Sequence, residues 1–333
     1  MPLFTKPNVL VTGGAGFLGS HVCEELLKHN KVICVDNFIS GSERNIDHLL
    51  SNPDFEFVRH DINQPIDLGT LPALSRFKVA FQGIQEVWHL ACPNTPGKAD
   101  EHSIETLSVC SMGTLQTLQI AQKYNAKFLF ASSAVVYGPR RSDTPLKEED
   151  EGIVNLFSSC AAYDEGKRFG EMASFMYQQR FQFPVRIARL FGIYGPRMAV
   201  GQGNLIADLI DEAISNENLV IKGNPQAKAS LCYVSDVIDA LVKMMGDSQG
   251  FLLLNIGSDQ PVLLSDVAQS VVQITGSTSN IHSEAGNEEK LPLALPDIHK
   301  ARETISWFPL VPLTDGIRRT YDYILAHKGI LGM

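Results

Sequence analysis

The sequence predicts an α/β protein with a doubly wound parallel sheet and a smaller C-terminal α/β lobe that binds substrate. In the first half of the 333 residues, short apolar runs alternate with amphipathic stretches, which is typical of βαβ units. After about Pro196 this alternation loosens, and the hydrophobic content of 44% is sufficient for a large core and an appended lobe. We therefore expect one domain over 1–195 and a mainly substrate-binding lobe over 196–333, with some segments crossing between them.

The individual elements follow from the apolar runs in chain order. The expected strands are Asn8–Val11, Lys31–Val35, Phe55–Val58, Glu86–Leu90, Ala126–Ala131 and Val185–Leu190. The expected helices between them include His21–Lys28, Ile104–Lys123 and Tyr163–Gln179. The last two helices are long enough to cover a sheet face or to pair across a subunit interface, so we expect a homodimer. In the C-terminal lobe, Ser265 and Thr314 are helix-start signals.

The charge pattern favours a small-molecule partner. The net charge is −9, and Lys and Arg alternate with Asp and Glu, so the chain lacks the basic stripe with which proteins neutralise nucleic-acid phosphates. No segment reaches the roughly 18 apolar residues of a membrane span, and "MPLFTKPNVLVTGG" enters a strand-like run without a charged leader. We expect a cytoplasmic protein that binds neither nucleic acid nor membrane.

The cysteines are scattered along the sequence and have neither the paired spacing of a zinc site nor the density of a disulfide scaffold. They are Cys23, Cys34, Cys92, Cys110, Cys160 and Cys232. We expect reduced, mostly buried thiols and no metal site.

A glycine-rich turn follows the first expected strand. In "VTGGAGFLGSH", Gly13, Gly16 and Gly19 allow a tight turn, close approach of a pyrophosphate and close helix packing, while the helix N-terminus favours negative charge. About 20 residues later, "VICVDN" places Asp36 where a carboxylate accepts both ribose hydroxyls and repels a 2′-phosphate. These features predict a Rossmann domain that binds NAD in preference to NADP. The expected cofactor-binding residues are Gly13, Gly16, Phe17, Leu18, Gly19, Asp36, Asn37, Ser40, Gly41, Asp61, Ile62, Leu90, Ala91, Tyr163 and Lys167.

The candidate catalytic residues are Ser133, Tyr163 and Lys167. Lys167 follows Tyr163 by four positions, so the two share one helix face. An ammonium near a phenol lowers its pKa, which lets Tyr163 exchange a proton with a carbinol during hydride transfer. Lys167 can also hold the nicotinamide ribose. Ser133, in "SSAVVYG" at a strand end, can hydrogen-bond the same substrate oxygen.

With these motifs the chain resembles the extended short-chain dehydrogenase/reductases, the NAD-dependent nucleotide-sugar epimerases and dehydratases. The resemblance covers essentially the whole chain through "VTGGAGFLGSH", "VDNFISG", "HDI", "HLACPNTP", "SSAVVYG", "YDEGKR", "RLFGIYGPRM", "YVSDV", "NIGS" and "PDIHKA". "VDNFISGSERN", "YDEGKRFGE", "GPRM" and "YVSDV" look most like the UDP-glucuronate decarboxylases. The resemblance implies a retained NAD that oxidises a sugar carbon, usually C4, to a ketone and later returns the hydride.

The chain departs from these relatives beside the catalytic hydroxyl. The decarboxylases and 4,6-dehydratases of the family carry an acidic residue where this chain has Ala134 and Val135. Dehydration needs an acid and a base beside the ketone, and the usual source of both is missing here. The pattern SSAxVYG is instead similar to 4-epimerases, in which the ketone rotates and is reduced from its other face.

The substrate side departs further. The family's phosphate-binding Asn and two Arg residues correspond here to Gly192, Ala229 and Ala294. Each charged hydrogen bond from such an Arg contributes roughly 1.5–3 kcal/mol, so either other cations replace them or the substrate is not a usual nucleotide diphosphate sugar. The candidate replacement cations are Lys228, Arg197 and the pair Arg140–Arg141, and the expected substrate-binding residues are Pro93, Ala134, Arg140, Gly192, Arg197, Asn204, Leu205 and Lys228.

Two further positions differ from the relatives, because Cys110 replaces an Asn and Cys92 replaces a Ser. We interpret both as small buried residues, although a thiol beside the nicotinamide can also donate a proton. Three functions remain open. They are a nucleotide-sugar 4-epimerase-like enzyme, a one-way NAD-dependent dehydrogenase acting on a secondary alcohol of a non-standard sugar, cyclitol or antibiotic precursor, and an NAD-sensing binding module without catalysis.

Overall fold

The central sheet is fully parallel and doubly wound. The computed structural model describes residues 6–93, 101–140, 142–284 and 294–331. The strands lie in the order β11 (Phe251–Ile256), β6 (Val185–Leu190), β5 (Lys127–Ser133), β4 (Glu86–His89), β1 (Asn8–Thr12), β2 (Lys31–Asp36) and β3 (Phe55–Arg59). The predicted fold class is therefore confirmed, and each predicted strand is present with its ends displaced by at most two residues.

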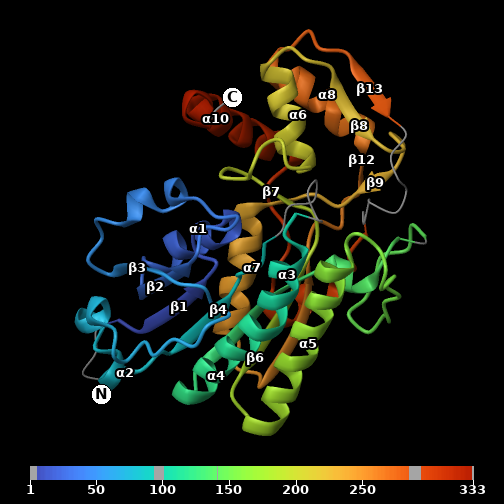
Figure 1. Cartoon of the computed structure of the whole chain (residues 1–333). Coiled ribbons are helices and arrows are strands. Elements are labelled where there is room, and N and C mark those ends of the chain that lie inside the picture. Colours follow the sequence, from blue (N-terminus) through green and yellow to red (C-terminus); the bar gives the residue numbers. More distant parts are fainter. Residues whose placement is uncertain (1–5, 94–100, 141, 285–293, 332–333) are drawn as a thin grey trace.

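Helices cover both faces of this sheet (Figure 1). One face is covered by α3 (Ser103–Ser108), α4 (Thr114–Tyr124) and α5 (Ala161–Phe181), and the other by α1 (Phe17–Leu26) and α7 (Val234–Gly246). Successive strand side chains point to opposite faces. Accordingly, Val9 and Val11 belong to the apolar core under α1, whereas Leu10 belongs to the core under α4. Both faces are buried, which explains why the strands read as continuous apolar runs.

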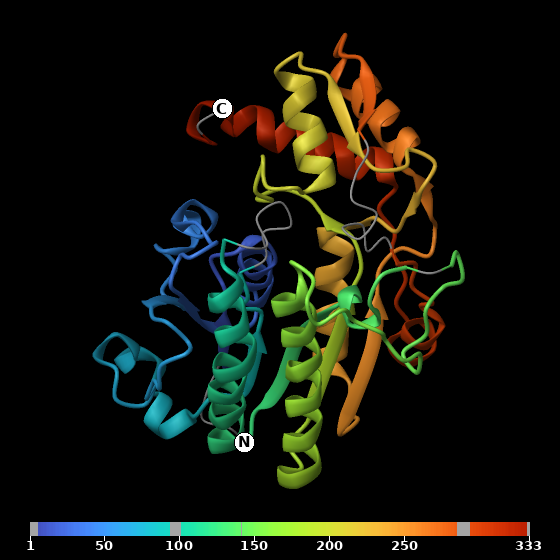
Figure 2. The ribbon, with the colours of Figure 1, turned by 45° about the vertical axis from the view of Figure 1, so that its right-hand side comes forward.

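The C-terminal lobe lies beyond the carboxyl ends of the sheet strands (Figure 2). Its helices are α6 (Leu205–Ile214), α8 (Leu264–Thr275) and α10 (Leu313–Leu331). Its short strands pair as β8 (Leu219–Lys222) with β13 (Ile281–Glu284), β9 (Lys228–Ala229) with β12 (Val262–Leu263), and β7 (Ile193–Tyr194) with β10 (Cys232–Tyr233). Although β11 and α7 follow residue 195, β11 is the edge strand of the main sheet and α7 packs on that sheet. We propose a domain boundary near residue 195 and assign β11 and α7, which follow it in the chain, to the N-terminal domain.

The remaining regular segments are short. They are α2 (Val79–Gln82), α9 (His299–Ile305) and the 3-10 turns Glu43–Asn45, Asp47–Leu49, Pro72–Phe77 and Ala134–Tyr137. Within the described ranges, none of the helices combines the length and the apolar character that crossing a membrane requires.

The predicted helix boundaries need correction at several places. The first helix begins at Phe17 rather than His21, because Gly19 lies within its first turns and not in the preceding loop. The predicted helix Ile104–Lys123 is interrupted by a π-helical turn over Val109–Gly113. Hydroxyl groups bond to carbonyls around this widened turn, including Ser111 to the carbonyl oxygen of Leu107 at 2.6 Å. The helices predicted from Ser265 and Thr314 each begin one residue earlier.

Candidate active site

A cavity of about 1460 Å³ lies between the carboxyl ends of the sheet strands and the C-terminal lobe. Typical ligand pockets occupy roughly 300–1,000 Å³, so this one has room for a dinucleotide and a second ligand together. The cavity brings together most of the residues predicted from the sequence. They are Gly13, Gly16, Phe17, Leu18, Gly19, Asp36, Asn37, Ser40, Gly41, Asp61, Ile62, Leu90, Ala91, Pro93, Ser133, Ala134, Tyr163, Lys167, Gly192, Arg197, Asn204 and Leu205.

The glycine-rich turn leaves no room for side chains. Gly13 has φ +71°, and a Cβ there would lie 2.6 Å from the Cα of Ala91 on the neighbouring strand end. A Cβ on Gly19 would collide with the carbonyl oxygen of Gly13. The first turn of α1 therefore packs directly on the loop, and Gly16, Phe17, Leu18 and Gly19 line the cavity. The first N–H groups of a helix have no partner within the helix and suit a pyrophosphate. The cradle fits NAD.

Asp36 lies at the end of β2 and is 8% exposed. Its two carboxylate oxygens accept hydrogen bonds from the backbone N–H groups of Ala15 at 2.9 Å and Phe38 at 2.8 Å. Burial raises the pKa of this carboxyl, and the backbone donors oppose the rise. Each oxygen keeps a lone pair for a ribose hydroxyl, so Asp36 can hold the glycine-rich turn and a cofactor at the same time.

Tyr163 and Lys167 lie on successive turns of α5 and face the end of β5. The Lys167 ammonium donates a 2.7 Å hydrogen bond to the carbonyl oxygen of Ala131 and lies 5.6 Å from the centre of the Tyr163 ring. Burial raises the pKa of Tyr163 to about 12, while the Lys167 charge and a hydrogen bond with Ser133 lower it. The three predicted catalytic side chains therefore meet at one place on the cavity wall.

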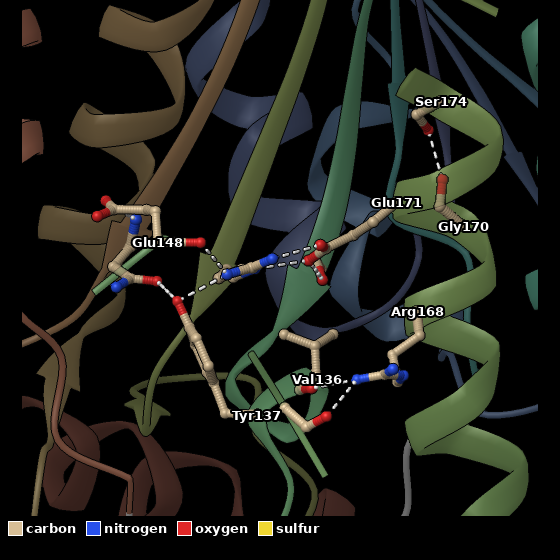
Figure 3. Close-up of polar contacts among 11 residues, drawn as sticks. Val136, Tyr137, Glu148, Arg168, Gly170, Glu171 and Ser174 are labelled. Carbon is tan, nitrogen blue, oxygen red and sulfur yellow. Dashed lines mark hydrogen bonds and ion pairs between the residues drawn. The ribbon is translucent and has the colours of Figure 1, made fainter. Parts of the chain in front are cut away.

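A buried polar network supports this strand end from behind (Figure 3). Arg189, on β6, binds both carboxylate oxygens of Glu171 at 2.9 and 2.8 Å and donates to the Tyr137 hydroxyl at 2.8 Å. Glu171 also accepts a 2.5 Å hydrogen bond from Ser132, and Tyr137 donates to Asn255 at 2.8 Å. The network therefore ties α5, β5, β6 and β11 together beside Ser133. This network was not predicted from the sequence, although the two arginines inside the apolar run "VRIARL", of which Arg189 belongs to it, were an available signal.

Two cysteines meet beside the catalytic side chains. The Cys92 and Cys110 sulfurs are 3.3 Å apart, with Cys92 on the cavity wall and Cys110 buried in the π-helical turn. Their hydrogen bond lowers the pKa of Cys92 to about 7, with a further contribution from the Lys167 charge, and raises that of Cys110. Burial lowers the pKa of Lys167, but Cys92 and Tyr163, with smaller contributions from Cys110 and Glu171, raise it above its ordinary value.

The positions that differ from relatives on the substrate side are apolar and buried. Ala229 is 0% exposed and Ala294 is 3% exposed, and Ala294 packs with Ala134 and Phe191. Gly192 has φ +47°, and a Cβ there would collide with the carbonyl oxygen of Ser230. Gly192 is therefore required by the local backbone, and no cation comes from these positions.

The candidate replacement cations divide into two groups. Arg197 lines the cavity and is held against α1 by Glu24 at 2.6 Å. Arg140 and Lys228 lie outside the cavity lining and both bind Asp143, Lys228 at 3.1 Å, while Arg141 lies outside the described residues. A lysine that the sequence analysis missed, Lys222, lines the cavity from the end of β8. The sequence could not assign Lys222 to the cavity, because its place there depends on how the lobe packs over the strand ends.

Asp164, which also lines the cavity, is a second residue that the sequence analysis missed. Burial, with a smaller contribution from Glu165, raises its pKa to about 6 from the ordinary 3.8. Between these values the folded state holds a proton that the unfolded state releases, so this group makes folding less favourable as the pH rises from 4 to 6.

We expect Asp164→Asn to be more stable relative to wild type at pH 7.5 than at pH 4.5, because the amide cannot ionise. Urea unfolding of both proteins at the two pH values measures the difference. An equal stability difference at both values would contradict the raised pKa.

Comparisons with known proteins agree with this site. Residues 9–257 match the model of the NAD dependent epimerase/dehydratase family. The chain is 33% identical over 319 residues to UDP-glucuronic acid decarboxylase 1 of Xenopus tropicalis, covering 96% of this chain and 72% of that protein. It is also 33% identical to UDP-glucuronic acid decarboxylase 6 of Arabidopsis thaliana, covering 93% of this chain and 86% of that protein.

Two solved structures that are similar to this chain contain nucleotide sugars. A UDP-glucuronic acid 4-epimerase from Bacillus cereus, in complex with UDP-glucuronic acid and NAD, has a TM-score of 0.83 and 28% identity, covering 96% of this chain and 99% of that one. The UDP-glucose 4-epimerase from Thermotoga maritima, with UDP-glucose, has a TM-score of 0.84 and 25% identity over the same shares. These matches confirm the resemblance predicted from the sequence. The chain belongs to the NAD-dependent epimerase/dehydratase family and is an NAD-dependent enzyme of the extended short-chain dehydrogenase/reductase group.

Proposed function

We propose that this chain is a nucleotide-sugar 4-epimerase-like enzyme that works through a 4-keto intermediate. The observation that carries the proposal is the wall that follows Ser133, where Ala134 is buried and packs with Ala294. A reaction limited to oxidation and return of the hydride needs no further acid or base at this wall. Asp164 is rotated by about 100° around α5 from Tyr163, so the two side chains leave the helix in different directions.

The glycine-rich turn and Asp36 hold the cofactor in this proposal. Gly13 and the first turn of α1 receive the pyrophosphate, and Asp36 accepts the adenosine ribose hydroxyls. Asp61 and Ile62, which line the cavity, are the proposed adenine-binding residues. NAD, when bound, supplies an acceptor for a hydride that can also give it back.

Tyr163 moves the proton in this proposal. Its phenol oxygen takes the proton of the substrate hydroxyl as the carbon becomes a ketone, and returns it on reduction. Lys167 favours the phenolate electrostatically, and Ser133 hydrogen-bonds the Tyr163 hydroxyl and orients the substrate oxygen. The carbonyl oxygen of Ala131 fixes the Lys167 ammonium at 2.7 Å, so the charge lies near the phenol before substrate arrives.

Arg197 and Lys222 are the proposed cations for a substrate diphosphate. Both line the cavity, Arg197 after β7 and Lys222 at the end of β8 in the lobe. UDP-glucuronic acid and UDP-glucose are the first substrates to test, because they occupy solved relatives. The alternative is a one-way dehydrogenase for an alcohol without a diphosphate, which the buried Ala229 and Ala294 favour.

The test is turnover of UDP-glucuronic acid and UDP-glucose by the purified protein without added cofactor. The 4-epimer is followed by proton NMR and free NADH by absorbance. Formation of the 4-epimer without free NADH supports the epimerase. NADH that accumulates only with added NAD supports the dehydrogenase, and release of carbon dioxide from UDP-glucuronic acid would overturn the proposal.

We also propose a homodimer that pairs α3 and α5 with their counterparts. These helices belong to the layer that covers one face of the sheet, and they carry apolar side chains that are exposed to solvent. They are Ile104, Leu107, Met172, Phe175 and Met176. A large exposed apolar patch of this kind is typical of a subunit interface. The molar mass in solution, measured by light scattering, tests this proposal, and a monomer at micromolar concentration would contradict it.

A further inference from the structure

We propose that Cys92 and Cys110 form a reversible redox site in the cavity wall, at which a hydroperoxide converts the two thiols to a disulfide. Their sulfurs are 3.3 Å apart, so they reach bonding distance through a shift of about 1 Å. The two residues come from separate segments, since Cys92 lies in the loop after β4 and Cys110 in the π-helical turn before α4. A disulfide would therefore add a covalent link between two segments that are otherwise joined by packing and by hydrogen bonds such as that from Thr106 to the carbonyl oxygen of Pro93.

Cys92 is the reactive member of the pair. It is partly exposed and lines the cavity, so a small oxidant reaches it through the same opening as substrate. The Lys167 ammonium and the Cys110 thiol both favour its thiolate, which is the nucleophilic form. An accessible thiolate beside a fixed cation has the properties of a peroxide-sensitive cysteine.

Cys110 is the resolving member. It is 1% exposed, so it does not meet the oxidant directly, but its sulfur already contacts that of Cys92. A π-helical turn places one additional residue in the helix, and such turns are frequent at functional sites. Here Cys110, in the widened turn, packs closely against Gly166. A Cβ added to Gly166 would lie 3.0 Å from the Cys110 sulfur.

The chemistry balances with a hydroperoxide as the oxidant. The Cys92 thiolate attacks the peroxide oxygen, and the O–O bond breaks to give a sulfenic acid and hydroxide, or alkoxide from an organic hydroperoxide. The Cys110 sulfur then attacks the Cys92 sulfur, the S–OH bond breaks, and water leaves with the Cys110 proton. Two electrons pass from the thiol pair to the peroxide. A thiol reductant restores both thiols by exchange.

The chain contains its own control pair. Cys23 and Cys34 are also hydrogen-bonded to one another, but both are 0% exposed. The hydrogen bond with Cys23 and burial, with a smaller contribution from Asp36, raise the pKa of Cys34, which keeps Cys34 as a thiol. Both pairs therefore have adjacent sulfurs. Only Cys92 among these four is accessible from the cavity, and only Cys92 and Cys110 have Lys167 as a neighbouring cation.

Oxidation has a direct consequence for the adjacent catalytic turn. Gly166 lies between Tyr163 and Lys167 on α5, and Cys110 packs against it. Drawing the Cys110 sulfur toward Cys92 alters this contact and removes the thiolate that stabilises the Lys167 charge. We expect oxidised protein to turn over more slowly, a consequence that rests on the proposed function, whereas disulfide formation itself does not.

The test exposes the reduced full-length chain to hydrogen peroxide, blocks the remaining thiols with iodoacetamide after denaturation, and maps the peptides without reduction. We expect one cross-linked pair that contains Cys92 and Cys110 and that dithiothreitol removes. These two thiols should be lost at least about tenfold faster than those of Cys23 and Cys34. Equal rates for the two pairs, or a stable thiol at Cys92, would overturn the proposal.

Two variants distinguish the roles within the pair. In Cys110→Ser the sulfenic acid at Cys92 cannot be resolved, so dimedone should label Cys92 more strongly than in wild type. In Cys92→Ser, Cys110 should remain a thiol because the oxidant no longer has an accessible partner. Loss of Cys110 without Cys92 would contradict the assignment. If no sugar substrate is turned over but the cross-link forms, the proposed function fails while the redox site stands.

Discussion

Replacement of Tyr163 by Phe is expected to lower kcat by a factor of about 10³ while NAD binding is retained. The phenol oxygen is the proton acceptor and donor in the proposed reaction, and positioned acid–base groups contribute roughly 10²–10⁴-fold. The ring itself packs beside Lys167 at 5.6 Å and remains in the variant, so the cavity wall is preserved. The measurement combines steady-state kinetics with NAD binding by fluorescence or calorimetry.

The matched control is Tyr177→Phe on the same helix. Tyr177 contacts Phe181, with ring centres 5.4 Å apart, and it does not line the cavity. Its replacement removes the same hydroxyl from α5 and should leave kcat within about twofold, as is usual for substitutions away from a site. A Tyr163→Phe variant with wild-type kcat would exclude both the epimerase and the dehydrogenase.

The cofactor cradle and the Tyr163–Lys167 pair could be predicted because local sequence determines them. Gly13 and Gly19 are close in the chain, and their mutual contact requires glycine whatever the rest of the fold does. Tyr163 and Lys167 share a helix face through their spacing alone. Parallel strands then bring Asp36 and Ser133 to the same sheet edge, so the order of elements was enough to place them near the cavity.

The substrate side and the support network could not be predicted, because they depend on contacts between distant segments. The Arg140 guanidinium donates a 2.6 Å hydrogen bond to the backbone carbonyl oxygen of Lys228, 88 residues away. Both side chains also bind Asp143, so their charges are used within the fold. Lys222 reaches the cavity only through the position of the lobe. The apolar residues around the π-helical turn recur with the spacing of a continuous helix. The sequence pattern therefore does not reveal the turn.

Replacement of Glu171 by Ala is expected to destabilise the protein by up to about 3–5 kcal/mol, the cost of removing one partner from a fully buried ion pair, because most of the Glu171 and Arg189 side chains is buried. The Glu171 and Arg189 side chains are 13% and 12% exposed, so water cannot replace the lost carboxylate freely. Ser132 loses its acceptor in the same step. Urea unfolding measures the change in free energy, and a lower kcat is expected because Ser132 adjoins Ser133.

Glu165→Ala is the matched control, since Glu165 lies on the same helix and pairs with Arg168 at 3.6 Å while both side chains are more than a third exposed. Exposed pairs contribute about 0–1 kcal/mol, so this variant should remain close to wild type. The double variant Glu171→Met with Arg189→Met removes both buried charges and should cost less than Glu171→Ala alone, because no unpaired charge remains. If instead the double variant loses at least as much stability as Glu171→Ala, the loss of stability comes from the missing hydrogen bonds to Tyr137 and Ser132 rather than from the unpaired Arg189 charge.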